Sequence, residues 1–235
     1  MFDNRTITTS ELPALFVTGI VPLPHNDIRI DISSNMNIAA VKEAEQYRNH
    51  ICIIVQKGES IKVTDPNNNT ALCLIAKVNM NFGVGTKVRR LRIETIVRCK
   101  VNEYIQVKPF PIVNITTVPS IYGESTEEQI LLNKIKEAYL SEINKDYKID
   151  WNDAELVSDL LPTTLKLTHE QKIKLLETPE INERLLIIYD AVNTSKLYKQ
   201  IDMKIENDVR KSVEASQKEY YLREKMHAIQ DELGD

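Results

Sequence analysis

The chain has no sequence feature that marks a membrane-spanning or secreted protein. None of its 235 residues belong to a run of about eighteen consecutive apolar residues, the length that a membrane-spanning helix requires. The N-terminus also lacks the basic segment and apolar run that a secretory signal needs. We therefore expect a cytoplasmic protein with no membrane partner.

Motifs that carry catalysis are absent as well. In Gly83-Val84-Gly85-Thr86-Lys87, a threonine separates the second glycine from the lysine, so the segment does not match a phosphate-binding loop and is predicted to be a hairpin turn. The sequence contains no Gly-x-Ser-x-Gly, His-x-x-x-His or Cys-x-x-Cys spacing. We expect no catalytic residue, no bound cofactor and no metal site in these residues.

Cysteine is scarce, with three residues in the whole chain. Cys52, Cys73 and Cys99 each stand alone within an apolar or alternating stretch. This pattern favours buried thiols in a reducing compartment over a disulfide framework.

Charge is divided unevenly between the two halves of the chain. Residues 1–115 hold 14 Lys and Arg against 10 Asp and Glu, whereas residues 116–235 hold 16 against 24. The positive excess of the first half is too small to indicate a polybasic surface for nucleic acid.

The first half of the sequence alternates as β-strands do. Residues 28–32 place isoleucine at every second position, and residues 90–101 alternate apolar side chains with charged ones on a predicted solvent face. Further strands are predicted at residues 51–56, 71–78, 104–108 and 112–118, with one helix at residues 36–48. Short strands separated by turn residues favour a small β-barrel or sandwich over residues 1–118.

The second half is predicted to be helical. Ser125 with Glu128 and Thr168 with Gln171 have the spacing of capping boxes, and each pair precedes an apolar run. A short helix at residues 153–161 is expected to end at Pro162, and another is expected at residues 180–192. These helices form a predicted bundle over residues 119–195, so the fold is of the α+β class.

A long helix is predicted at the C-terminal end because no proline or glycine occurs between Glu180 and Leu233. The short polar side chains of Asn193-Thr194-Ser195 are the expected break before it, since they favour an N-cap. A helix from near Lys196 to Leu233 would be roughly 55 Å long, and we expect residues 196–235 to project as a neck.

The apolar residues of this helix change their spacing along its length. Up to Val213 the apolar residues recur at every fourth position, so this series winds around the helix. Packing on its own domain and binding of a separate partner explain this half of the helix equally well. Beyond it, the apolar residues form a nearly straight seam that a lone domain would leave exposed. We expect this seam, with Tyr220, Tyr221, Leu222, Met226 and Ile229, to bind a partner other than its own domain, either a neighbouring subunit or a further module of the protein.

Four stretches of the sequence carry a family signature. They are Leu12-Pro13-Ala14-Leu15 through Val21-Pro22-Leu23, residues 91–101, Leu167-Thr168-His169-Glu170-Gln171-Lys172 through Leu175-Leu176-Glu177-Thr178, and the closing QKEYYLREKMHAIQDELG. In this order they resemble the N-terminal region of the Lon protease family. The last stretch is the most specific, and the resemblance covers essentially the whole chain.

The resemblance implies a homohexameric, ATP-dependent serine protease. In that family an AAA+ ATPase module, which uses ATP and Mg, and a protease domain with a Ser-Lys dyad follow the N-terminal region. The N-terminal region itself is a PUA-like β domain, a helical bundle and a long neck helix. It captures misfolded, abnormal or tagged proteins, so unfolded protein segments are the expected partners.

The sequence departs from the family pattern around its first loop and in two strands. Cys73 and Thr95 stand where glycines are common, and Asn26-Asp27-Ile28-Arg29 replaces the usual Phe-Pro-Gly. We expect altered bulges, an altered loop and, with the loop, an altered substrate preference. Val21, Leu23 and Ile28 are the candidates for substrate contact, although packing in the core is the simpler explanation of all three.

Two other functions are compatible with the sequence. PUA-like folds often bind RNA, and Arg89, Arg90, Arg92, Arg98 and Lys100 form a basic cluster, but no aromatic residue lies between Phe82 and Tyr104 to stack on bases. A free-standing chaperone or adaptor that binds unfolded clients would also lack catalytic residues.

Overall fold

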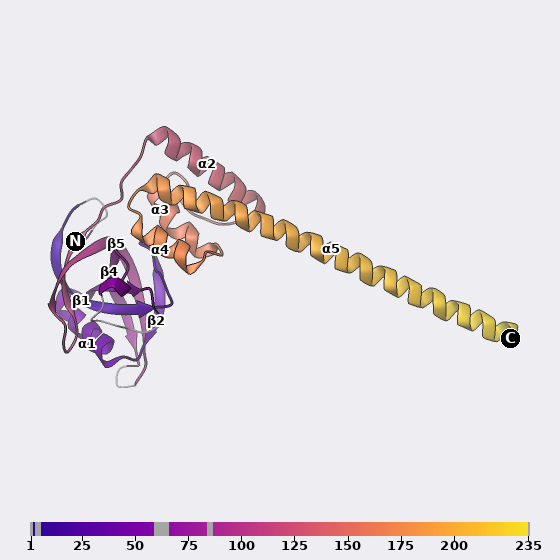
Figure 1. Ribbon diagram of the computed structural model, residues 1–235, viewed down its shortest axis with the longest axis horizontal. Helices are drawn as coiled ribbons and strands as arrows, with labels where there is room; N and C mark the ends of the chain where they lie inside the picture. The colour runs from indigo at the N-terminus through magenta and orange to yellow at the C-terminus, as the bar shows by residue number, and fades with distance from the viewer. Residues whose placement is uncertain (1, 3–5, 59–65, 84–86, 235) are drawn as a thin grey trace. The chain divides into compact units, whose positions relative to one another are not determined.

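A computed structural model describes residues 2, 6–58, 66–83 and 87–234 (Figure 1). The chain divides into two compact units, Met1–Val192 and Asn193–Asp235. The first unit holds all the strands and most of the helices, and the second consists of the later part of one helix. Within the described ranges, no helix is both long enough and apolar enough to cross a membrane.

Six strands build the sheet of the first unit in the order β2-β5-β4-β3-β1-β6. Their bounds are β1 Thr9–Thr18, β2 Asp27–Ile32, β3 His50–Gln56, β4 Cys73–Phe82, β5 Arg89–Gln106 and β6 Ile112–Thr117. Strands β1 and β3 are parallel, and the other pairs are antiparallel. The long β5 pairs with β2 and β4 and also with β6, which closes the sheet into a barrel. The predicted α+β fold with a small β-barrel is confirmed.

Alternate side chains of these strands point to opposite faces and fill two apolar clusters. The cluster inside the barrel consists of Leu12, Ala14, Phe16, Cys52, Ile54, Cys73, Ile75, Val97, Cys99, Val113 and Ile115. The three thiols are buried, as predicted, and the sulfurs of Cys52 and Cys99 lie 3.9 Å apart. The other faces of the same strands, through residues such as Leu15 and Ile53, join one cluster with the helices.

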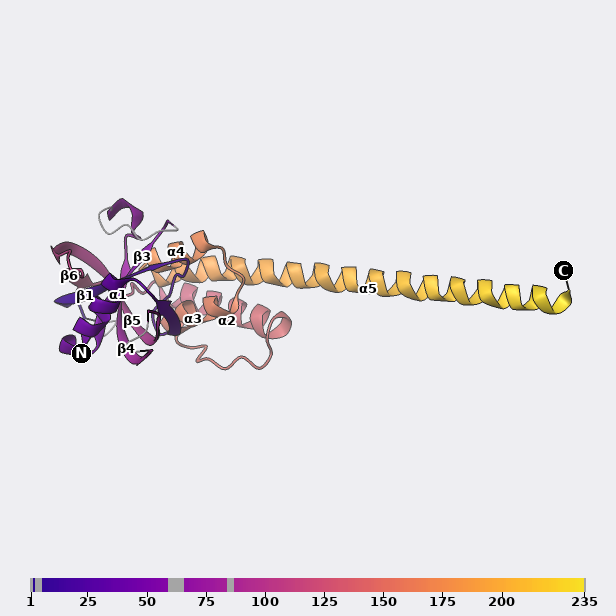
Figure 2. The same ribbon diagram turned by 90° about the horizontal axis from the view of Figure 1, so that it is seen from below.

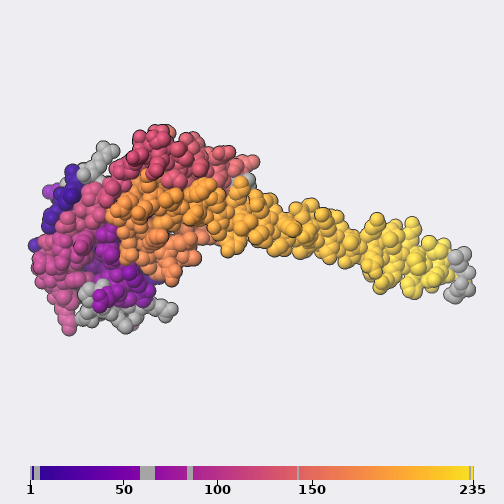
Figure 3. Space-filling model, turned by 45° about the horizontal axis from the view of Figure 1, so that its top comes forward, coloured from indigo at the N-terminus to yellow at the C-terminus, as the bar shows by residue number. Residues whose placement is uncertain are grey.

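Five α-helices lie in the described residues: α1 Asn35–Glu43, α2 Ser125–Glu142, α3 Ala154–Leu160, α4 His169–Glu177 and α5 Ile181–Leu233. The capping box of Thr168 and Gln171 at α4 is confirmed, and Asp153 caps α3 by accepting a hydrogen bond from the Leu156 amide. Helices α2, α3, α4 and the first turns of α5 lie side by side in two views (Figures 1 and 2). Their atoms adjoin those of the barrel without a gap (Figure 3).

Two predictions about individual elements are wrong, and a third is not tested. Ser125 does not cap α2, because Glu124 holds the extended N-cap conformation and Ser125 is already the first helical residue. The strands predicted at residues 90–101 and 104–108 are one strand, β5, since register shifts between Val101 and Gln106 accommodate the break in alternation. The turn predicted at residues 83–87 includes residues 84–86, which lie outside the described residues.

The helix break predicted at Asn193-Thr194-Ser195 is also wrong, because α5 is a single helix of 53 residues. Residues such as Asn, Thr and Ser destabilise a helix interior by only about 0.5–0.7 kcal/mol each relative to alanine. A break would leave four N–H and four C=O groups without helical partners. The boundary between the two compact units nevertheless falls at Asn193, whereas the boundary predicted between residues 118 and 119 lies inside the first unit.

Candidate functional site

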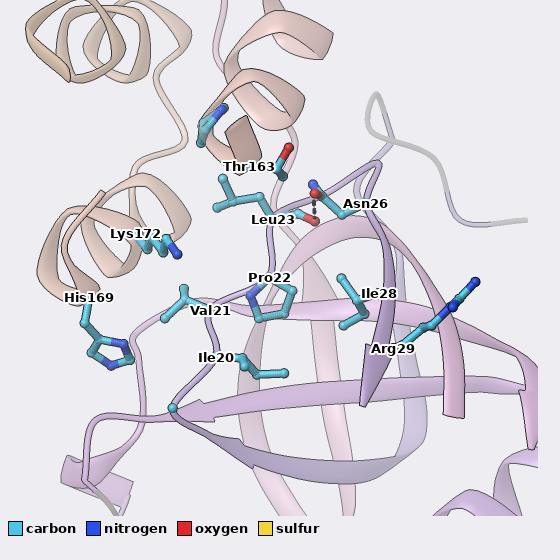
Figure 4. A pocket seen from close by; sticks show the side chains of 12 residues that line it. Ile20, Val21, Pro22, Leu23, Asn26, Ile28, Arg29, Thr163, His169 and Lys172 are labelled. Atoms are coloured by element: carbon cyan, nitrogen blue, oxygen red, sulfur yellow. Dashed lines mark hydrogen bonds between the residues drawn. The ribbon is translucent and has the colours of Figure 1, made fainter. Parts of the chain in front are cut away.

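A pocket of about 470 Å³ lies where the loop after β1 meets the segment from α3 to α4 (Figure 4). This volume is within the roughly 300–1,000 Å³ that is usual for ligand sites. The residues that line it are Gly19, Ile20, Val21, Pro22, Leu23, Asn26, Ile28, Arg29, Pro162, Thr163, His169 and Lys172. Two segments far apart in the sequence therefore build one site.

The lining is apolar on the side of the β1–β2 loop. Ile20 is 40 % exposed, Val21 and Ile28 are half-buried, and Leu23 is buried. The side chains of Ile20, Val21, Pro22 and Ile28 lie around the same space in Figure 4. An apolar group of a ligand that enters here would leave water, which is the main source of favourable binding free energy for such surfaces.

Thr95 of β5 holds the loop that carries these residues. Its hydroxyl group donates a hydrogen bond to the Leu23 carbonyl (2.5 Å) and accepts one from the Asn26 amide (3.0 Å). The backbone groups of Thr95 also bond to those of His25 and Asn26. Gly19 begins the loop with a φ of +76°, a conformation that side-chain-bearing residues rarely adopt. Thr95 therefore fixes the end of the loop, and Gly19 allows the chain to turn at its start.

The side chain of Asn26 connects the loop to the helices. Its Nδ2 lies 3.1 Å from the Leu23 carbonyl oxygen, 2.7 Å from that of Pro24 and 3.1 Å from that of Asp159 at the end of α3. Thr95 and Asn26 are both residues at which we expect departures from the family pattern. The loop that they hold is a stabilised structure and forms one wall of the pocket.

Behind the pocket, two buried arginines share one buried carboxylate. Asp159 Oδ1 accepts hydrogen bonds from Arg98 Nη2 and from Arg184 Nη1, both at 2.8 Å, and the three side chains are 0–2 % exposed. Arg98 also donates to the carbonyls of Leu175 and Leu176 at the end of α4, where helical partners are missing. This network attaches α3, α4 and α5 to β5 and so fixes the helical wall of the pocket.

The positive charge of Arg184, the second arginine of the network, is only partly compensated by nearby carboxylates. Burial lowers the pKa of Arg184 to about 10, while the nearby Asp159 carboxylate opposes this shift. Its Nη2 donates to the Ser120 hydroxyl (2.9 Å), and that hydroxyl donates to Glu155 (2.5 Å). Arg184 thereby extends the network to the segment before α2.

The seam residues of α5 are solvent-exposed. Tyr220, Tyr221, Leu222, Met226 and Ile229 have exposed fractions between 49 and 66 %. All five belong to the second compact unit, and Glu219 supports this part of the helix through an ion pair with Arg223 at 3.1 Å. An exposed apolar patch of this kind on a helix is typical of an interaction surface.

Comparison with known proteins finds one family over most of the chain. Residues 11–194 match the family model described as the ATP-dependent protease La (LON) substrate-binding domain. The match includes the whole pocket and almost the whole first unit. The chain belongs to the LON substrate-binding domain family.

Full-length relatives of this domain are Lon proteases. The chain is 29 % identical to the Lon protease of Aster yellows witches'-broom phytoplasma over 96 % of this chain and 30 % of that protein. It is 29 % identical to the Lon protease of Brevibacillus choshinensis, again over 96 % of the chain and 30 % of the relative. The chain therefore spans about a third of the length of these relatives.

Solved structures confirm the fold of this LON domain. The N-terminal domain of the Mycobacterium avium complex Lon protease matches with a TM-score of 0.64 at 21 % identity, over 78 % of this chain and 98 % of that one. The Lon N-terminal domain protein from Xanthomonas campestris matches with a TM-score of 0.51 at 15 % identity, over 75 % of this chain and 95 % of that one.

The structure brings all three predicted substrate-contact residues of the LON domain to the pocket. Val21 and Ile28 are half-buried and accessible, whereas Leu23 is 3 % exposed and belongs mainly to the core. Sequence reasoning missed Ile20, Arg29, His169 and Lys172. One signal could have found His169 and Lys172. Both lie in a stretch that resembles the family, and the residues up to Leu23 lie in another such stretch.

Three of the five residues of the basic cluster predicted on β5 are already bound to acidic side chains. Arg98 is 2 % exposed and is used in the buried network, so the prediction that it faces solvent is wrong. The helices cover the part of the strand that carries it. Arg90 and Arg92 form ion pairs with Asp31 and Asp27 of the neighbouring strand. These contacts argue against the RNA-binding alternative.

One group of side chains in the described residues has the composition of a metal site. Ligand atoms of His25, Glu155 and Asp159 lie within 4.8 Å of one another. Asp159, however, already binds the guanidinium groups of Arg98 and Arg184, whose positive charges repel a cation. The group is better explained as part of the ion-pair network.

Proposed function

We propose that this LON domain binds unfolded segments of protein substrates in the pocket and presents them to an ATP-dependent protease. The observation that carries the proposal is the pocket itself, since accessible apolar side chains from the β1–β2 loop lie within the region that matches the substrate-binding family. Unfolded proteins expose apolar side chains, which folded proteins bury. A shallow apolar pocket would therefore discriminate between the two states.

In this proposal the binding of one segment to one pocket is weak. The parent enzyme would use ATP and Mg in an AAA+ module to pull the bound segment toward a protease domain with a Ser-Lys dyad. Several domains held together in a hexamer would raise the effective concentration of the pockets, and avidity can exceed the single-site affinity by about two orders of magnitude or more.

The test replaces the accessible apolar side chain of the pocket. Full burial of an isoleucine is worth roughly 1.5–3 kcal/mol. Because Ile20 is 40 % exposed, its remaining surface can contribute about 0.6–1.2 kcal/mol, or a three- to eightfold change in affinity. We expect Ile20→Ser to weaken binding of a reduced and alkylated, permanently unfolded protein by this factor, measured by fluorescence anisotropy.

Ile130→Ser is the matched control. Ile130 is 50 % exposed on α2 and does not line the pocket. The substitution removes a similar apolar surface and should leave the affinity unchanged. Equal affinities for the Ile20→Ser and Ile130→Ser variants would show that unfolded segments bind elsewhere.

We propose a second role for the seam of α5, which is contact with neighbouring subunits. The exposed apolar residues Tyr220, Tyr221, Leu222, Met226 and Ile229 support it. In the whole protein, Tyr221→Ala combined with Met226→Ala should dissociate the hexamer in sedimentation velocity experiments. Tyr198→Ala combined with Met203→Ala, on the same helix, is the control, and dissociation by both pairs alike would contradict a specific seam.

A further inference from the structure

Strand β2 forms one edge of the sheet in the described part of the chain. It pairs with β5 on one side, and no described strand pairs with its other side. We propose that an extended segment of an unfolded protein binds this free edge as an added strand and is held there by backbone hydrogen bonds. The inference rests on the proposed function, because it names how the segment that enters the pocket is held beyond it.

The pairing with β5 determines which backbone groups face the free edge. The Asn26 carbonyl accepts a hydrogen bond from the Thr95 amide, so Asn26 faces β5 at the start of β2. Successive residues of a strand direct their N–H and C=O groups to opposite sides, so the three isoleucines of β2 also face β5. The residues that face the free edge are Asp27, Arg29 and Asp31. No backbone hydrogen bond joins them to another segment of the described chain.

The charged side chains of β2 leave this edge uncovered. Asp27 and Asp31 form ion pairs with Arg92 and Arg90 of β5, and β5 lies on the side of β2 opposite the free edge. The Arg29 side chain points away from the apolar side chains of the pocket in Figure 4. All three residues that face the free edge are exposed. An incoming backbone can therefore reach their N–H and C=O groups.

A second pocket of about 370 Å³ lies along the same strand. Residues 16–18 of β1 and residues 29–32 of β2 are part of its lining. On the β1 side, the Phe16 amide donates to Asn37 Oδ1 (3.2 Å), and Asn37 Nδ2 donates to the Phe16 carbonyl (2.9 Å). The Asn37 side chain thus satisfies Phe16 as a neighbouring strand would. This leaves β2 as the side of the second pocket that takes an added strand.

The second pocket continues the first one, because Ile20 and Arg29 line both of them. A segment that places an apolar side chain beside Ile20 is therefore led along β2. The six residues of β2 extend over roughly 20 Å at about 3.3 Å per residue, which is enough for several backbone hydrogen bonds.

An unfolded segment is the occupant that fits such an edge. Its N–H and C=O groups are free and have the spacing of a strand when the segment is extended, whereas folded proteins use these groups in their own helices and sheets. Backbone groups are common to nearly all residues, so this mode of binding suits substrates of varied sequence. A second copy of the chain is disfavoured, because a short edge strand with charges at alternate positions hinders pairing between copies.

The experiment is an N-methyl scan of a peptide with blocked ends, in which valine and threonine alternate around a central leucine. Each amide is methylated in turn, and affinities for the chain are measured by fluorescence anisotropy. In an added strand, only every second N–H faces β2. We expect methylation at these positions to weaken binding by roughly two- to twelvefold each, the value of one hydrogen bond, and methylation at the intervening positions to leave the affinity unchanged. Equal effects at all positions would overturn strand addition.

Arg29→Pro tests the same edge from the side of the protein. The Arg29 N–H faces away from β5, so proline removes it without removing a hydrogen bond of the sheet, and prolines are tolerated at such edge positions. We expect the variant to bind the peptide roughly two- to twelvefold more weakly. Ser125→Pro is the control, because Ser125 is the first residue of α2, where proline fits. It should leave the affinity unchanged, and urea unfolding checks that both variants are folded.

Arg29→Ala separates the backbone of Arg29 from its side chain. The substitution removes the guanidinium group but keeps the N–H, so this variant should bind the peptide more tightly than Arg29→Pro does. Equal losses in the two variants would show that the guanidinium group binds the peptide, and strand addition would be wrong. If Arg29→Pro does not fold, the N-methyl scan of the unsubstituted chain decides the question.

The outcomes also separate this inference from the proposed function. A scan without alternation, together with weaker binding of every peptide by Ile20→Ser, would refute strand addition and leave the pocket as the binding site. Alternation that persists in Ile20→Ser at unchanged affinity would place the segment on the strand edge alone, and the proposed role of the pocket would be wrong. If neither methylation nor Ile20→Ser changes any affinity, both proposals are wrong.

Discussion

Replacing Asp159 by asparagine should destabilise the first compact unit more than any surface substitution. The carboxylate is fully buried and accepts hydrogen bonds from Arg98 and Arg184 at 2.8 Å each. Asparagine has nearly the same shape but no charge, so two buried guanidinium groups lose their shared counter-ion. Removing one partner of a buried ion pair destabilises a protein by about 3–5 kcal/mol.

We expect a value near the lower end of that range. The Glu155 carboxylate also acts on the charge of Arg184, and the Leu175 and Leu176 carbonyls still accept hydrogen bonds from Arg98. A domain of ordinary stability has a free energy of unfolding of about 5–15 kcal/mol, so a loss of about 3 kcal/mol is a large part of the total.

The assay is urea unfolding followed by the fluorescence of Trp151, the one tryptophan of the chain. This residue lies in the first unit, with its ring centroid 6.0 Å from that of Tyr139. With a urea m-value of about 1–3 kcal/mol/M, the midpoint should fall by roughly 1–3 M.

Asp27→Asn is the matched control for the same chemical change. Asp27 forms an exposed ion pair with Arg92, which solvent screens, so its substitution should hardly move the midpoint. If Asp159→Asn moves the midpoint as little as Asp27→Asn does, the buried network does not hold the barrel and the helices together, and the reasoning is refuted.

Two further predictions concern the loop and the effect of pH. Thr95→Val keeps the shape of the side chain but removes its hydrogen bonds to Leu23 and Asn26, so urea unfolding should show a loss of about 1–3 kcal/mol, and peptide affinity should fall with it; unchanged stability and affinity would contradict the role of Thr95. Burial lowers the pKa of His50 below its usual 6.5. Below pH 6.5 the unfolded chain therefore binds more protons than the folded chain, and the stability that is present above pH 6.5 should decrease as the pH falls. His50→Gln should flatten this part of the curve of stability against pH, and an unaltered slope would exclude His50 as its cause.

The strands and helices of this domain were largely predictable because their signals are local. Alternation located β2, the strands β3, β4 and β6 were predicted within about four residues of their bounds, and the Thr168 capping box located the start of α4. The errors arose where a local signal was outweighed. Asn193-Thr194-Ser195 looks like a helix break, but continuing the backbone hydrogen bonds is more favourable than satisfying eight free groups at two new helix ends.

The candidate site was only half predictable. Val21, Leu23 and Ile28 are close in sequence to the unusual loop, so local reasoning reached them. His169 and Lys172 join the site only because helix α4 lies against the loop, and a contact between residues about 140 positions apart has no local signal. Arg98 shows the same limit, since alternation gave it a solvent face that the helices in fact cover.

The sequence by itself determined the fold class, the absence of recognisable catalytic motifs and the family resemblance, because all three depend on short-range patterns of residue type. Only the tertiary structure decided which residues form the pocket, which arginines are available for binding and which are buried. The reason is that one residue, Asp159, holds three segments of the chain at once. Its carboxylate binds Arg98 and Arg184, and its backbone carbonyl accepts a hydrogen bond from Asn26, so its effect depends on distances in space that the order of residues does not specify.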